Sequence, residues 1–461
     1  MVKIVKSTIQ TLVKVTGYLL SHGALRALVK SLAVQLVISL SLFADSNPLD
    51  GFNVTVKDLV VAGKTVRISP FKGIGVVTVN LCFKNTGDKL SPKQKEALVA
   101  LLCRAMGEVT QSKTREQMQA YAREHNVHVS FGSSDDNFTV TGKCPSDKLS
   151  ELFHLIKDIL FHSQFYDSDL IRFKNEMAAG MLQAMQSPDT QLDQLMKKVI
   201  FKNHPYGTLN KTYLASLKNI SVDDLKSYMR KCFTQENIII SACGDIDEDG
   251  LAVHITDVVT ALPKTFNVAL PENVQVVGPY QEHTQAFPVP QTLIHFLHAG
   301  INAHHPDFFA LQIAMGCLSN PNIGVLWKKI RVEKGLTYNI GAGFAIQNHY
   351  NSFNISTSTQ SENVEKTISS IKEVIVDVCE NGFSAELVEI VKKSFLGNYK
   401  RSFASTSHIT TRLTNYQLDG RSVDFHNILI EKISNLTTDE INEAFKRFMK
   451  PDQFVVFMVG K

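Results

Sequence analysis

The second half of the chain contains histidines close together in the sequence, and histidine is a common zinc ligand. They are His295, His298, His304 and His305. His295 and His298 are three residues apart in a predicted strand, so their side chains point to opposite faces. The other two precede Pro306, a pattern typical of a turn before a helix. Because a metal site needs convergent ligands, this spacing favours structural histidines.

The other metal-binding residue types are also better explained by structure. The seven cysteines have no Cys-x-x-Cys spacing, and most lie in apolar runs, where cysteine acts as a small hydrophobic residue. The SSDD segment at residues 133–136 gathers hydroxyls and carboxylates, but between two predicted strands this composition is typical of a turn. The cysteines are Cys82, Cys103, Cys144, Cys232, Cys243, Cys317 and Cys379.

The elements that must position any functional side chain come in two similar sets. Residues 219–244 are echoed without a gap by residues 435–460, at an offset of 216 residues. Such self-similarity predicts two similar domains in one chain. Strands and helices are mixed in both halves. We therefore expect an α+β fold of two homologous α/β sandwich domains, each a sheet with helices packed on one face.

Periodicity and turn residues predict most of these elements in both halves. Strands are expected at residues 54–61, 65–68, 75–83, 127–131, 137–142, 238–242, 293–298, 338–347 and 352–359. Helices are expected at residues 93–106, 113–125, 147–163, 168–185, 306–318, 363–381 and 385–402. The repeated unit closes each half with a further helix and strand.

Length and composition indicate a soluble globular protein with more than one domain. The chain has 461 residues, of which 44% are hydrophobic and 20% charged. The net charge is only +4, and no basic run is interleaved with aromatic residues, which argues against a nucleic-acid-binding protein. We expect a leader at residues 1–44, an N-terminal domain at 45–262, a proline-containing linker at 263–290 and a C-terminal domain at 291–461.

The leader differs from the rest of the chain. Residues 1–44 contain no Asp or Glu, and basic residues precede an apolar run at 32–44. This run is short for a membrane span and has the length of a signal-peptide core. It predicts a periplasmic or secreted protein with no stable membrane span once the leader is removed. A mitochondrial presequence, a buried helix and a misassigned start are the alternatives.

Three motifs, in this order within two repeated halves, carry a family resemblance. They are HPYG at residues 204–207, the VDDL…GDID arrangement at 222–247 and IRVEKGLTY at 330–338. The chain after its leader resembles the pitrilysin/insulinase zinc peptidase family, which includes mitochondrial-processing-peptidase-like proteins. Active members carry His-x-x-Glu-His on a first-half helix, where the two histidines bind zinc and the glutamate is the general base. A glutamate on a later helix completes the ligand set.

The resemblance implies a member in which this metal site is degenerate. The segment KEALVALLCRAMG, residues 95–107, takes the place of the motif helix. Ala100 and Arg104 then occupy the histidine positions, and Cys103 occupies the glutamate position. Glu176 lies about one helical turn from the place expected for the later ligand. Alanine offers no lone pair, and arginine is a permanent cation that repels a divalent metal. We therefore expect no zinc in this chain and no catalysis from it alone.

The resemblance also implies that Arg331 and Tyr338 bind substrate. In the family, the matching residues reach towards the zinc held by the facing domain, where they hold the substrate backbone and the developing oxyanion. Arginine supplies forked charged donors and tyrosine a hydroxyl donor, both suited to a polarised carbonyl. The structural alternative is that Arg331 ends a helix and residues 335–338 turn into a strand. The loop LSNPNIG at 318–324 departs from the family's glycine-rich loop, which puts that loop's substrate role in doubt.

These features favour a non-catalytic subunit of a heterodimeric pitrilysin-type zinc endopeptidase. It would close the peptide chamber of a catalytic partner that carries His-x-x-Glu-His and zinc, and contribute Arg331 and Tyr338 to peptide binding. The alternative is a structural or peptide-binding protein with a peptidase fold and no proteolytic role. The sequence leaves open whether the partner is a different chain or a second copy.

Overall fold

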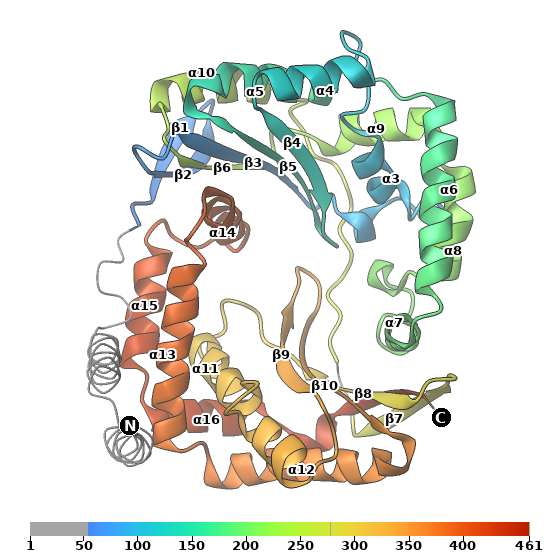
Figure 1. Ribbon diagram of the computed structural model, residues 1–461, viewed down its shortest axis with the longest axis vertical. Coiled ribbons are helices and arrows are strands. Elements are labelled where there is room, and N and C mark those ends of the chain that lie inside the picture. The colour runs from blue at the N-terminus through green and yellow to red at the C-terminus, as the bar shows by residue number, and fades with distance from the viewer. Residues whose placement is uncertain (1–53, 277, 461) are drawn as a thin grey trace, which may run out of the picture. The chain divides into compact units, whose positions relative to one another are not determined.

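The computed structural model describes residues 54–276 and 278–460, so the leader predicted at residues 1–44 lies outside the described residues. Two sheets and the helices around them form a mixed α+β fold, as the sequence predicts (Figure 1). One sheet is built from the first half of the chain and the other from the second half. Together they form a single compact unit that begins at Val54.

The first sheet has six strands in the order β1-β2-β6-β3-β5-β4. β2 and β6 run parallel, and the other neighbours are antiparallel. β3 and β6 lie inside the sheet, and almost all of their residues are buried. The strands are β1 Lys57–Val61, β2 Lys64–Pro70, β3 Val76–Lys84, β4 His128–Ser133, β5 Asn137–Pro145 and β6 Ile238–Gly244.

The second sheet has five strands in the order β7-β11-β8-β10-β9. Its one parallel pair is β7 with β11, and the remaining pairs are antiparallel. β7 lies within residues 263–290, so part of this segment adds an edge strand to the second sheet. The strands are β7 Gln281–Ala286, β8 Gln291–Ala299, β9 Ile340–Ile346, β10 Asn351–Gln360 and β11 Val455–Gly460.

From β3 to β6 in the first half and from β8 to β11 in the second, helices alternate with strands in a similar order. The first half contains α3 Leu98–Ala105, α4 Arg115–Glu124, α5 Leu149–His162, α6 Asp167–Ala184, α7 Pro188–Ile200, α8 Asn210–Ser216, α9 Val222–Cys232 and α10 Glu248–Ala261. The second half contains α11 Phe308–Ser319, α12 Val364–Asn381, α13 Ala385–Arg401, α14 Thr406–Leu418, α15 Phe425–Asn435 and α16 Thr438–Phe448. Between α11 and β9, Trp327–Glu333 forms a π-helix.

The repeated sequence is a repeated structure. Helix α9 leads into β6 in the first half, and α16 leads into β11 in the second. Both helices begin with a capping box, in which Ser221 or Thr437 accepts from the third backbone N–H and the third side chain returns the bond. Each following strand pairs parallel with one neighbour and antiparallel with the next. The duplication predicted from the sequence is therefore confirmed.

The two halves exchange a helix. The first half's own helices α5 and α10 contact one face of its sheet, as predicted, whereas α14 from the second half contacts β2, β3 and β6 (Figure 1). In return, α7 from the first half contacts β7, β8 and β11 of the second sheet. Helices α7, α8, α10, α14 and α15 were not predicted from the sequence. This exchange buries both faces of the central strands and joins the halves.

Polar side chains join α14 to the first sheet. The hydroxyls of Thr406 and Thr78 lie 2.8 Å apart. About two turns further along α14, Thr414 accepts from the amide of Asn80 at 3.3 Å and shares a hydrogen bond with the hydroxyl of Ser241. Asn80, Ser241 and Thr414 are all buried, so these bonds satisfy groups that burial would otherwise leave unpaired.

Candidate peptide-binding site and degenerate metal helix

Helix α3 presents the residues that replace the expected metal ligands. Its apolar side, which includes Leu98 and Leu102, is buried in the first-half core. Ala100 and Cys103 are only partly buried, and Arg104 is exposed. Helix α3 also contacts α6, the helix that carries Glu176. The fold therefore brings together the two helices that the sequence comparison with active family members predicts would share a metal.

An ion pair takes the place of metal ligation between these helices. Arg104 lies 3.8 Å from the carboxylate of Glu176, and their side chains are 54% and 46% exposed. Arg172 approaches the same carboxylate at 3.2 Å. Glu176 therefore has two guanidinium groups near it, and their charge opposes the approach of a divalent cation. The residues here do not fit a zinc ion.

Cys103 does not supply a ligand either. Burial raises the pKa of its thiol to about 12, an effect that the hydrogen bond from Ser133 only partly offsets and that nearby Asp88 increases. A thiol must lose its proton to bind zinc or to act as a nucleophile. At neutral pH Cys103 is therefore a neutral, partly buried side chain on the motif helix.

Arg331 and Tyr338 lie against each other in the second half. The guanidinium carbon of Arg331 is 4.5 Å from the ring centroid of Tyr338 and 5.6 Å from that of Trp327. Tyr338 is 76% exposed. Arg331 belongs to the π-helix, a form often found at functional sites. Gly335, with φ of +62°, then turns the chain towards β9.

The charge of Arg331 is not neutralised by a neighbouring carboxylate of the described chain. Glu333 pairs with Lys329 at 3.3 Å, and Lys334 pairs with Glu373 at 2.8 Å, so the nearby acidic groups are engaged elsewhere. A stacked guanidinium keeps its N–H groups in the plane of the fork, where they can donate to a carbonyl or carboxylate. The pair Arg331 and Tyr338 is thus a fixed donor group at an exposed surface.

The histidines of the second half are held in separate contacts. His295 hydrogen-bonds the amide oxygen of Asn354 at 3.1 Å, whereas His298 bonds the Ala299 carbonyl at 2.8 Å. Burial lowers the pKa of both imidazoles. His305 accepts from the backbone N–H of Asp307 at 3.1 Å, as in a turn before a helix. In the described ranges, no group of three or more His, Cys, Asp or Glu side chains has the geometry of a metal site.

The HPYG and SSDD segments have a role that the sequence reasoning missed. Residues 133–136 form the predicted turn between β4 and β5, but Asp136 is only 5% exposed. Its carboxylate accepts from the hydroxyl of Tyr206 and, at 3.1 Å, from the backbone N–H of Asn348 in the second half. Asp135 accepts from the side chain of Gln347. The two segments therefore connect the halves.

The surroundings of Tyr206 and His204 shift the pKa of both side chains. Burial and the bond to Asp136 raise the pKa of Tyr206. Burial lowers the pKa of His204, whose ring bonds the Glu272 carbonyl at 3.0 Å. Both shifts favour neutral side chains near pH 7, which suits a structural connection better than proton transfer.

No helix among the described residues is long and apolar enough to cross a membrane.

Comparison with known proteins finds similarity to M16 peptidases and to their non-peptidase homologues. Residues 219–395 match the family described as "Peptidase M16 inactive domain". The "Non-peptidase homolog YmxG" of Helicobacter pylori is 22% identical over 378 residues, which cover 80% of this chain and 85% of that protein. The "Uncharacterized zinc protease YmxG" of Bacillus subtilis is 20% identical over 372 residues, which cover 78% and 83%.

Solved structures share the fold. The peptidase M16 inactive domain from Pseudomonas fluorescens superposes with a TM-score of 0.80 at 21% identity, covering 89% of this chain and 98% of that one. The periplasmic protease PqqL from Escherichia coli gives a TM-score of 0.74 at 15% identity, covering 90% of this chain and 47% of that one. The fold of paired sheets and helices is therefore shared with M16-like proteins.

Proposed function

Because the chain belongs to the pitrilysin/insulinase-type (M16) peptidase family yet has lost its metal-binding motif, we propose that it is the non-catalytic subunit of a heterodimeric zinc endopeptidase. The partner carries His-x-x-Glu-His and zinc, and this chain closes the peptide chamber and binds peptide through Arg331 and Tyr338. The relative from H. pylori that is named a non-peptidase homolog supports the non-catalytic part of the proposal.

The observation that carries the proposal is the contrast between the two halves. On α3 and α6, Arg104 and Glu176 form an ion pair where metal ligands are expected. In the second half, Arg331 and Tyr338 remain stacked, at the spacing of the family motif. A donor pair with no charge partner in the described chain has no evident structural use at an exposed surface, whereas it suits a peptide carbonyl.

The proposal includes a cellular location for the protein. The basic and apolar pattern of residues 1–44 favours export. The structural relative PqqL is a periplasmic protease. We place the heterodimer in the periplasm or outside the cell.

The central experiment compares the chain alone with the complex formed with the product of a neighbouring gene that encodes the intact motif. Peptide cleavage and bound zinc are measured for both. We expect neither in this chain alone, and both in the complex. In the complex, Arg331→Ala lowers kcat by roughly two orders of magnitude, because a charged donor to the developing oxyanion is lost. Tyr338→Phe has a smaller effect in the same direction.

Lys328→Ala is the matched control, because Lys328 is an exposed cation on the same π-helix. It should leave turnover unchanged, and the zinc content of the complex should be equal in all variants. Stoichiometric zinc and activity in this chain alone would contradict the proposal. A complex whose activity does not respond to Arg331→Ala would instead support a structural, peptidase-fold protein.

A further inference from the structure

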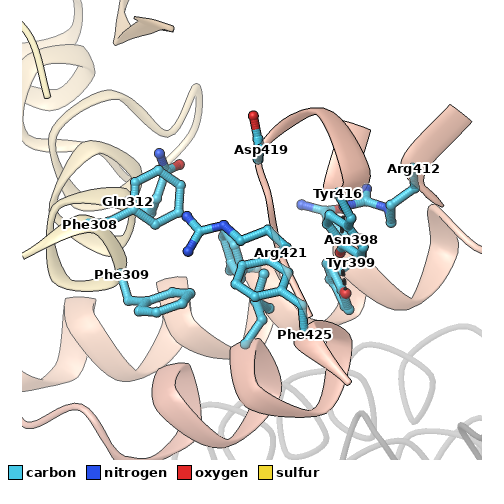
Figure 2. Close-up of a pocket in the computed structure, with 12 residues that line it drawn as sticks. Phe308, Phe309, Gln312, Asn398, Tyr399, Arg412, Tyr416, Asp419, Arg421 and Phe425 are labelled. Atoms are coloured by element: carbon cyan, nitrogen blue, oxygen red, sulfur yellow. Dashed lines mark hydrogen bonds between the residues drawn. The ribbon is translucent and has the colours of Figure 1, made fainter. Parts of the chain in front are cut away.

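A cavity of about 370 Å³ opens between α11, α13, α14 and α15 of the second half (Figure 2). This volume lies in the usual range for sites that bind small organic molecules. Much of its wall is aromatic, with Phe308 and Phe309 from α11, Tyr416 from α14 and Phe425 from α15 among the lining residues. The cavity lies on elements different from those that carry Arg331 and Tyr338.

Two arginines give the cavity positive charge. The guanidinium carbon of Arg421 lies 4.4 Å from the ring centroid of Phe425 and 5.6 Å from that of Phe308, and one nitrogen donates to the Ala303 carbonyl. Figure 2 shows this guanidinium in the middle of the lining side chains. Arg412 stacks on the ring of Tyr416 at 6.0 Å and bonds its hydroxyl at 3.5 Å.

Neither arginine forms an ion pair with a residue of the described chain. Among the lining residues that the structure describes, Asp419 is the one carboxylic acid, and in Figure 2 it points away from the guanidinium of Arg421. Burial raises the pKa of Asp419, an effect that Arg421 reduces. The other polar lining groups are the side-chain amides of Gln312 and Asn398 and tyrosine hydroxyls. The cavity thus combines apolar walls with two arginines that form no ion pair with the residues that the structure describes.

We propose that this cavity binds a small carboxylate with an aromatic body, either as a free molecule or as the C-terminal residue of a peptide. The carboxylate lies against the free N–H groups of Arg421, and the ring lies among the aromatic side chains. Both interactions are the usual ones for these groups. The inference is independent of the proposed function, because it involves none of the residues on which that function depends.

The test measures binding to the full chain by calorimetry with N-acetyl-L-phenylalanine and with its amide. The two have the same body, and an uncharged amide replaces the carboxylate in the second. We expect the acid to bind at least roughly tenfold more tightly, because a hydrogen bond to a charged group contributes that much. A short peptide ending in phenylalanine, as free acid and as amide, distinguishes the sources: stronger binding of the peptide acid than of the single residue indicates a peptide terminus.

Arg421→Gln should reduce the affinity for the acid to that of the amide. Lys393→Gln is the control, since Lys393 is an exposed cation on α13 outside the cavity lining. If Arg421→Gln does not fold, Gln312→Glu tests the same charge from α11 and should abolish binding of the acid. Equal affinity for acid and amide, or unchanged acid binding in the variant that folds, would overturn the proposal.

Discussion

At the scale of single side chains, the ion pair between Arg104 and Glu176 determines the electrostatics of α3, the helix expected to replace the metal-binding one. Its two charges are partly exposed, so the pair itself contributes little to stability. Its effect is instead on metal binding, because a guanidinium group beside the carboxylate of Glu176 disfavours the approach of a metal cation. The same helix carries Cys103, whose neutral thiol adds no charge to the site.

Buried thiols make the stability of the protein sensitive to alkaline pH. Burial raises the pKa of Cys103, Cys144 and Cys317 to about 12, above that of an unfolded cysteine. Such a raised pKa contributes stability that is fully present below the unfolded pKa and is lost as pH rises through the folded one. The thermal midpoint should therefore fall between about pH 9 and about pH 12, as the unfolded chain alone ionises.

Differential scanning fluorimetry across this range measures the effect. Cys103→Ala should fall less steeply with pH than the wild type, because one titrating thiol has been removed. A midpoint that stays constant or rises with pH would contradict the prediction. The buried tyrosines shift in the same direction as the thiols, so the comparison between the two proteins isolates the contribution of Cys103.

At the scale of elements, buried polar contacts hold α14 of the second half against the sheet of the first half. Thr414→Ala removes the hydroxyl that bonds Asn80 and Ser241, and it leaves these buried groups without that partner. We expect the free energy of unfolding to fall by about 1–3 kcal/mol. Denaturant-induced unfolding, followed by circular dichroism, measures the change.

Thr411→Ala is the control on the same helix, because Thr411 is exposed. It removes the same atoms from a position that faces solvent and should change stability by less than about 0.5 kcal/mol. Equal losses in the two variants would mean that the buried hydroxyl network does not hold α14 to the sheet.

The sequence predicts those helices and strands that have a clear local pattern of apolar, turn and capping residues. The strand at residues 75–83 alternates, and the capped helix and strand of each repeat carry local signals, so most strands and the duplication were predicted correctly. Strand β7 was not predicted, because it lies in the segment expected to be a linker. Alternation alone suggests that Thr78 and Asn80 face solvent. The structure buries both, because α14 comes from the other half to cover them.

Helix α14 itself had no clear apolar stripe to reveal it. Several of the residues that it buries, such as Thr410 and Thr414, are polar and find their partners on the first sheet. For the same reason the buried Asp136 was predicted only as a turn residue, since its partners Tyr206 and Asn348 are far away in the sequence. Local patterns do not contain such long-range pairings. The proximity of Arg331 and Tyr338, by contrast, follows from a short motif.

At the scale of the whole molecule, each half depends on the other to cover its sheet. If residues 54–262 are expressed alone, the face of β3 and β6 that α14 covers becomes exposed. We expect this fragment to self-associate or precipitate rather than form a folded monomer, because an exposed, partly apolar sheet face promotes association. Size-exclusion chromatography with light scattering and circular dichroism measure the outcome.

Co-expression with residues 263–461 is the control and should give a soluble complex of the two fragments in equal amounts. A monomeric, cooperatively folding fragment 54–262 would show that the exchanged helix is dispensable. The connection through Asp136 and Tyr206 should not rescue the single fragment, since one of its partners, Asn348, belongs to the second half.

The exchange of α7 and α14 also determines which parts of the molecule can move as rigid groups. A sheet and the helix that covers it move together, so the rigid groups are the first sheet with α14 and the second sheet with α7. The mechanical boundary therefore differs from the boundary along the chain. Any opening between these groups has to bend the short connections on either side of both exchanged helices, so the segment that joins the two halves along the chain cannot act as the hinge alone.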